Sequence, residues 1–338
     1  MKHACCAALI AMVAAALWMI PLIRPGGAAP PPPPMVVGGP FQRVVYNFGT
    51  HTSIATPGLL REGPLVFKAP SIQYNDVTHI GWADGACSIT DGTETATSNH
   101  ALADFARRII TLGGAVHITF QLVRKGQSPA SVVLNCPSVT YQSSNGTARC
   151  DGGISGTISG IQELPGATIA RLAPGPKGQA PAPSGPASVQ AAVVTYDSHS
   201  RLLEASGWVV LSQGGSVIKA QGLTFDLNRN TLRMVGSVGY SDSAGRQLTG
   251  SQAIEDLERK SVLVIGPVTY TDRQKNRIQA ASATLDQGSQ VASFTGGVRY
   301  TNADGFVVQT PWASIQSLPN SAQRIQTGPL RMQGAAGV

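Results

Sequence analysis

Charged residues are scarce in this chain of 338 residues, where Asp, Glu, Lys and Arg together make up 13%. So little charge disfavours long solvated helices, and the 38 Gly and 23 Pro residues favour many short strands joined by turns. The formal net charge of +7 comes from Lys and Arg residues that are scattered singly. Nucleic-acid binding usually needs a clustered basic stripe, so we expect no nucleic-acid partner. Spaced cations are enough to attract anionic partners such as phosphorylated lipid headgroups.

The sequence also lacks the motifs of common catalytic and metal chemistry. It has no Gly-x-Ser-x-Gly nucleophile elbow, and no His-x-His or His-Glu-x-x-His pair that would bind a metal. The glycine-rich stretch 152–156 lacks the spacing and the lysine of a phosphate loop, so we interpret it as a β turn. We therefore expect a protein that is not an enzyme and that uses neither a cofactor nor a metal.

Cysteine is rare, with five residues and no Cys-x-x-Cys pair of the kind that binds zinc. Cys5 and Cys6 lie inside an apolar run and are interpreted as inert membrane residues. Among the other three, Cys136 and Cys150 are nearest in sequence and could pair in an oxidising compartment, which would leave Cys87 as a free thiol. The odd number leaves the pairing open.

An uncharged apolar run of 20 residues extends over residues 4–23. It is long enough to span a bilayer as a helix, which favours a membrane anchor over residues 1–23. Small residues at 26–28 offer a signal-peptidase site, so a cleaved signal peptide is the alternative. Either interpretation exports the rest of the chain. The Pro-rich residues 24–40 form a stiff spacer away from a membrane or a disordered segment.

A repeat of about 30 residues is the strongest signal in the sequence. Similar blocks begin at Ala191, Ala220, Gly250, Ala280 and Thr310, at spacings of 29, 30, 30 and 30 residues. In the first four of these blocks, an aspartate recurs at offset 6 from the start, a glycine at offset 16 and a valine at offset 18. Weaker copies upstream begin at Ala69, Ser98 and Cys136, which gives eight blocks. A Pro- and Gly-rich insertion at 161–189 separates a first repeat region, 41–160, from a second, 190–338.

Each block shows the two-residue periodicity of strands with one buried face. In the block at Ala220, apolar residues alternate around Phe225 and, after a turn at 228–230, alternate again from Leu232. A block is therefore predicted to form two strands, and its aspartate is interpreted as a turn cap, in preference to an acid-base or calcium residue. The glycine within each second strand costs stability, so we expect it to permit a bend that closes one sheet against another. A simple β-sandwich, with glycine at crowded packing positions, is the alternative.

These features predict an all-β fold. Its expected form is an elongated antiparallel β-jellyroll of about eight two-strand repeats of about 30 residues, preceded by an N-terminal apolar helix.

The repeat resembles the OstA-like β-jellyroll of the lipopolysaccharide-export proteins LptA and LptC. The stretches that carry the resemblance best are Thr195-Tyr196-Asp197 with Gly207-Trp208-Val209, and Thr224-Phe225-Asp226 with Gly236-Ser237-Val238. It covers residues 191–311 and, more weakly, 69–119. The resemblance implies a periplasmic protein with an apolar groove between two sheets for acyl chains, and with end strands that pair with other export proteins. The proline spacer, the insertion and the greater length depart from that family.

The expected function is that of a periplasmic carrier or bridge component of lipopolysaccharide export. Its expected partners are lipopolysaccharide or a related glycolipid, other lipopolysaccharide-export proteins, and the inner membrane if residues 4–23 are retained. The residues expected to line the groove are Leu223, Phe225, Leu232, Met234, Val238, Tyr240, Val262, Val264, Val268, Tyr270, Phe294, Val298 and Tyr300.

An interior that is packed shut is the alternative to a groove. It would suit a structural or adhesive β-repeat protein of the cell envelope that binds other proteins. A hydrolase built on a β-helix is disfavoured because the sequence shows no cluster of catalytic carboxylates.

Overall fold

The computed structural model describes residues 43–62, 65–91, 94–122, 130–142, 144–159, 185–197, 199–226, 228–229, 231–243, 245–256, 258–286, 288–289, 291–317 and 323–333. All regular secondary structure in these residues is β-strand, which confirms the all-β prediction. We find in them no helix with the length and apolarity of a membrane span. The predicted apolar helix, the Pro-rich spacer and most of the predicted insertion lie outside the described residues.

The chain forms two compact units. Unit 1 takes the described residues up to Thr157 together with Ala192–Leu203, and unit 2 takes those of Ile158–Ala191 and Glu204–Val338. The strands of unit 1 are β1 (Arg43–Asn47), β2 (Thr52–Thr56), β3 (Gly58–Glu62), β4 (Leu65–Ala69), β5 (Ser71–Asn75), β6 (Ile80–Asp91), β7 (Glu94–Asp104), β8 (Ile109–Leu122), β9 (Ala130–Gln142), β10 (Thr147–Asp151) and β13 (Val193–Asp197).

Strands β11 (Ile154–Ser159) and β14 (Leu202–Gln213) contribute residues to both units. The strands of unit 2 are β12 (Ala187–Ala191), β15 (Ser216–Asp226), β16 (Thr231–Ser241), β17 (Gln247–Asp256), β18 (Ser261–Thr271), β19 (Arg277–Asp286), β20 (Val291–Thr301), β21 (Val307–Ser317), β22 (Gln323–Thr327) and β23 (Arg331–Gln333). Strand β12 begins inside the predicted insertion.

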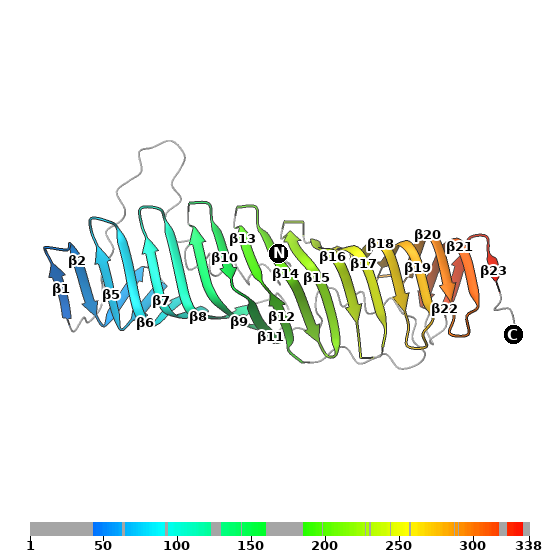
Figure 1. Ribbon diagram of the computed structural model, residues 1–338, viewed down its shortest axis with the longest axis horizontal. Coiled ribbons are helices and arrows are strands. Elements are labelled where there is room, and N and C mark those ends of the chain that lie inside the picture. Colours follow the sequence, from blue (N-terminus) through cyan, green and yellow to red (C-terminus); the bar gives the residue numbers. More distant parts are fainter. Residues whose placement is uncertain are drawn as a thin grey trace, which may run out of the picture. The chain divides into compact units, whose positions relative to one another are not determined.

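In each unit, a series of strands that follow one another along the chain pair antiparallel. In unit 2 this series extends from β15 to β21, and Figure 1 shows these strands side by side in chain order, from green to red. In unit 1 the longest strands, β6 to β9, pair in the same way. Short connections suffice for antiparallel neighbours, which is why the frequent turns of the repeat produce this order.

The register between neighbouring long strands of these series shifts near the middle of the strands, at a β-bulge. The register between β16 and β17, for example, shifts between Val235 and Val238. The recurring glycine of the repeat lies in this bulge: Gly236 has a φ of +72°, a left-handed conformation that is costly for residues with a Cβ atom. At Gly296 space is restricted as well, since a Cβ atom there would lie 2.5 Å from Cβ of Ala281. The predicted bend at the glycine is confirmed.

The bend divides each strand of the β15–β20 series into two halves that bury the same face. In β16, Leu232 and Met234 are buried before the bulge, and Val238 and Tyr240 are buried after it. Three residues separate Met234 from Val238, so the alternation resumes on the same side of the strand. We name layer A the halves next to the aspartate turns, and layer B the halves next to the turns 242–246, 272–276 and 302–306. Because both bury that face, the two layers enclose one interior.

The recurring aspartate ends a strand of layer A and caps the turn that follows. Oδ1 of Asp226 accepts hydrogen bonds from the backbone N–H groups of Asn228 and Arg229, both at 2.9 Å. One block later, Oδ1 of Asp256 accepts the corresponding pair at 3.0 Å. The interpretation of these residues as turn caps is confirmed.

Candidate functional site

A row of side chains crosses the inner face of layer B in unit 2, next to the turns. In register from β15 to β20 it contains Ile218, Tyr240, Leu248, Tyr270, Ile278 and Tyr300. Tyrosine alternates with an aliphatic residue because one block supplies two strands. Neighbouring strands lie about 4.8 Å apart, so the tyrosines recur at intervals of about 9.6 Å. We call this the tyrosine row.

Layer A presents two rows of mostly apolar side chains to the same interior. The row next to the aspartate turns contains Phe225, Leu232, Glu255, Val262, Leu285 and Ala292, and the row next to the bulges contains Leu223, Met234, Ala253, Val264, Ala283 and Phe294. All twelve are buried, and Glu255 is the one charged residue among them. Burial of each large apolar side chain contributes about 1.5 to 3 kcal/mol, so these rows hold the layers together.

The thirteen residues expected to line a groove all lie on these inner faces. Twelve are buried, and Tyr300 is half-buried. The structure therefore brings together, inside one unit, side chains that are up to 77 positions apart between Leu223 and Tyr300. Their exposed fractions range from 0% to 9% apart from Tyr300, so the side chains of the two layers are in close contact.

Tyr240 belongs to a hydrogen-bonded polar cluster at the edge of this interior. Its hydroxyl donates to Oδ2 of Asp242 at 3.1 Å and lies 3.4 Å from the Ser216 hydroxyl. Nε of Arg246 donates to the same carboxylate oxygen at 2.6 Å, although the Arg246 and Asp242 side chains are only 19% and 5% exposed. Burial raises the pKa of Tyr240 to about 12, so its hydroxyl is protonated at neutral pH.

Tyr270 occupies the equivalent position one block later, but its hydroxyl is in a different situation. The oxygen is buried and has no hydrogen-bond partner among the described residues. The carboxylate of the next turn, Asp272, instead accepts hydrogen bonds from the backbone N–H and the side-chain amide of Asn276, at 2.9 and 2.8 Å. Burial raises the pKa of Tyr270 as well, so the hydroxyl keeps its proton and remains a donor.

Glu255 and Arg246 are absent from the predicted site, as are Asp242 and Ser216 of the polar cluster. Glu255, at offset 5 of its block, is 3% exposed. The residues at offset 5 of the other blocks are Tyr196, Phe225, Leu285 and Ile315, so this break in the apolar pattern is a signal that could have found it. Arg246 gives no such signal, because the equivalent residues are Asn276 and Phe306.

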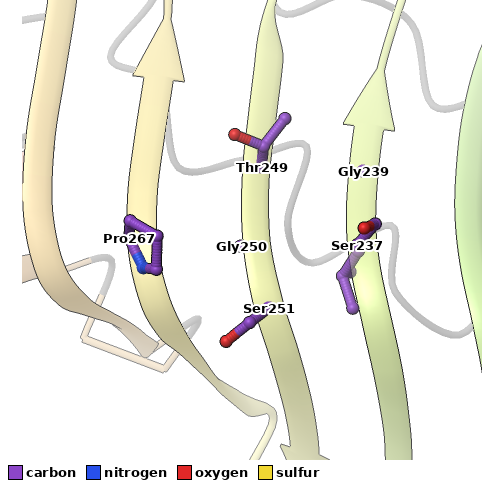
Figure 2. A pocket seen from close by; sticks show the side chains of 7 residues that line it. Ser237, Gly239, Thr249, Gly250, Ser251 and Pro267 are labelled. Atoms are coloured by element: carbon purple, nitrogen blue, oxygen red, sulfur yellow. The ribbon is translucent and has the colours of Figure 1, made fainter.

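A shallow hollow of about 310 Å³ lies over the bulges of strands β16, β17 and β18. Figure 2 shows that Ser237, Gly239, Thr249, Gly250, Ser251 and Pro267 border it from these three strands. The hollow arises because small residues occupy successive bulges. Val238 is the only residue of the predicted groove that also borders it, so the hollow and the predicted groove are different places.

Each unit has exposed apolar side chains on a strand at one end of its series. In unit 1, all five residues of β1 are exposed, among them Val44 at 56%, and β1 pairs with β2. In unit 2, β21 pairs with both β22 and β23, where Ile325 and Met332 are 63% and 68% exposed. Strands with such surfaces are suited to pairing with a further chain.

No group of His, Cys, Asp and Glu side chains in the described part of the chain could hold a metal ion. Cys87, Cys136 and Cys150 are all buried. The thiols of Cys136 and Cys150 are in hydrogen-bond contact, which together with burial raises the pKa of Cys150. Cys87 instead contacts the carbonyl oxygen of Ala83 at 3.7 Å.

Among solved structures, the chain is similar to LptH, described as the LptA homologous periplasmic component of the lipopolysaccharide transport device from Pseudomonas aeruginosa. The similarity covers 52% of this chain and 84% of that chain, with 12% sequence identity and a TM-score of 0.21. No family model matches the sequence. A search of curated proteins found no match either.

Proposed function

We propose that this protein is a periplasmic carrier or bridge component that holds the acyl chains of lipopolysaccharide, or of a related glycolipid, between the two layers of a β-jellyroll. The observation that carries the proposal is the interior of unit 2. Apolar rows from both layers face one another there, and the tyrosine row with its polar cluster lies at one edge. An amphiphile has the same division, with apolar chains beside a polar linkage and headgroup.

Entry of an acyl chain requires the layers to part, because the inner side chains are in contact with one another. The exchange has a small net cost when each lost contact between apolar side chains is replaced by a contact with the chain. Each CH₂ group that leaves water contributes about 0.8 kcal/mol. Each strand passes from layer A to layer B at the bend near its middle. The layers would therefore move apart by rotation about these bends.

The charges near the tyrosine row suit an anionic headgroup. Arg273 and Lys275 are exposed in the turn 272–276, which directly follows the strand of Tyr270. Spaced cations of this kind attract phosphate groups outside the apolar interior. The exposed end strands, β1 in unit 1 and β22 with β23 in unit 2, suit strand pairing with other export proteins. The proposal includes export, with residues 4–23 as an anchor or a cleaved signal, and no catalytic activity.

A photo-crosslinking side chain placed at Tyr300 tests the proposal. Tyr300 is half-buried, so it accommodates the larger group better than the fully buried positions do. Arg299, its neighbour on β20, is exposed on the outer face and is the matched control. After irradiation in the envelope of a lipopolysaccharide-producing cell, we expect a glycolipid adduct at Tyr300 and none at Arg299, detected by mass spectrometry. Only protein adducts at Tyr300 would contradict the carrier function.

The close contact of the layers favours a second candidate function. A structural or adhesive β-repeat protein would keep its core closed and bind other proteins with its surface and end strands. In that case the same experiment gives protein adducts at exposed positions and no lipid adduct inside.

A further inference from the structure

The Tyr270 hydroxyl is a buried hydrogen-bond donor that the described residues leave without an acceptor. The Tyr270 side chain is 6% exposed, so the described surroundings are almost entirely protein. A buried polar group without a partner costs about 1 to 3 kcal/mol, and native structures rarely retain one without a reason. A ligand that brings an acceptor to this point would remove that cost.

The surroundings of Tyr270 define the kind of acceptor. On the same face of β18, two positions deeper, Val268 is 1% exposed and belongs to the apolar interior. On the other side lies the turn 272–276, where the carboxylate of Asp272 is engaged by Asn276. The Tyr270 hydroxyl is thus at the boundary between the apolar interior and the polar turns. In an acylated lipid, this boundary corresponds to the carbonyl that links the hydrocarbon chain to the headgroup.

The comparison with Tyr240 shows that this arrangement differs between two successive blocks. Tyr240 and Tyr270 are each followed two residues later by an aspartate, yet Tyr240 donates to its aspartate and Tyr270 does not. Of the two buried tyrosines of the row, Tyr240 therefore has a hydroxyl that is internally satisfied, and Tyr270 has one that is available for a ligand. Since burial raises the pKa of Tyr270, the available group is a donor and requires an acceptor.

We propose that the Tyr270 hydroxyl donates a hydrogen bond to the carbonyl oxygen of an ester- or amide-linked acyl chain, and so fixes the depth to which the chain enters the interior. This inference rests on the proposed function and adds to it a residue and a chemical class of contact. An alkyl ether of equal length lacks the carbonyl and would lose the contact.

The test compares two probes on the full chain: monopalmitoyl glycerophosphate and its hexadecyl ether analogue. We expect the wild-type protein to bind the ester about fivefold more tightly than the ether, the effect of one neutral hydrogen bond. Tyr270→Phe removes only the hydroxyl and is expected to abolish the preference. Tyr141→Phe, on a buried tyrosine of unit 1 outside the proposed interior, is the matched control and should retain it. N-palmitoyl glucosamine phosphate then tells whether an amide carbonyl serves as well as an ester.

Thermal unfolding separates a binding role from a structural one. Removing a hydroxyl that has no partner leaves the melting temperature of Tyr270→Phe unchanged or higher, whereas Tyr240→Phe lowers it because Asp242 loses a donor. A preference for the ester that persists in Tyr270→Phe, or its absence from the wild type, would overturn the inference alone. If neither probe binds the wild-type protein, the carrier function fails together with it.

Discussion

The two units share the bent-strand plan but fill their interiors differently. In unit 1 a core cluster consists of Ala69, Ile72, Ala83 and Cys87, and Ile118 takes the offset at which unit 2 has its tyrosines. Unit 2 also buries the large side chains of Phe225, Met234 and Phe294 and the polar cluster around Tyr240. The bend and the alternation therefore depend on positions that the blocks share, whereas the chemistry of the interior depends on a few positions that differ between blocks.

The largest expected difference between the units comes from truncating a core side chain in each. Phe294→Ala in unit 2 should lower the free energy of unfolding by about 4 kcal/mol, and Val132→Ala in unit 1 by about 2 kcal/mol, because the larger side chain leaves the larger cavity. Denaturant-induced unfolding measures both. Equal losses would contradict the view that large side chains in unit 2 carry more of the packing energy.

A pair of adjacent glycines tests the bend itself. Gly296 and Gly297 both have a positive φ, at +83° and +82°, but only Gly296 is crowded, by Ala281. We expect Gly297→Ala to cost about 1 to 2 kcal/mol for its backbone conformation, and Gly296→Ala about 3 kcal/mol because the overlap adds to it. Denaturant titration of the two variants decides. Equal costs would mean that the neighbouring strand yields and that crowding does not contribute.

The cysteines offer a third contrast, since unit 1 contains two cysteines that are placed to form a disulfide. Cys136 and Cys150 are in contact, so an oxidising compartment should convert them into a disulfide while Cys87 stays reduced. Cross-linking a loop of this size stabilises the protein by about 2 to 3 kcal/mol.

Peptide mapping of non-reduced protein checks this pairing, because trypsin cleaves after Arg149 and separates the two cysteines into different peptides. We expect those peptides to remain joined until a reductant is added. Cys87→Ser is the control and should leave the link intact, whereas a link that includes Cys87 would refute the prediction.

The smallest effect concerns the pH dependence of unit 2. The pKa of Tyr240 is about 12 in the folded protein against an ordinary value of 10.0. Its stabilising contribution is therefore fully present below the ordinary pKa and is lost as the pH rises through the folded one, by about 1 kcal/mol near pH 11. The difference in unfolding free energy between wild type and Tyr240→Phe should shrink over this alkaline range. A difference that stays constant would contradict the folded pKa.

The sequence predicted the fold better than it predicted the candidate site. Alternating apolar residues and the recurring glycine predict the strands and their bend, because both signals are local and repeat in every block. The polar details are not local. Tyr240-Ser241-Asp242 and Tyr270-Thr271-Asp272 have the same pattern, yet their hydrogen bonds differ because Arg246 is replaced by Asn276 across the turn. Such differences depend on the folded turn and cannot be inferred from spacing.

Because the bulge has a constant position within each block, the length of the interior is set by the number of blocks. Adding or deleting one whole block of 30 residues, such as 250–279, inserts or removes two strands and leaves every remaining side chain on its original face. Each step changes the length of the interior by about 9.6 Å. Insertion or deletion of one residue within a strand would instead turn its apolar face to water. Duplication of whole blocks can therefore lengthen the interior without a change in the blocks already present.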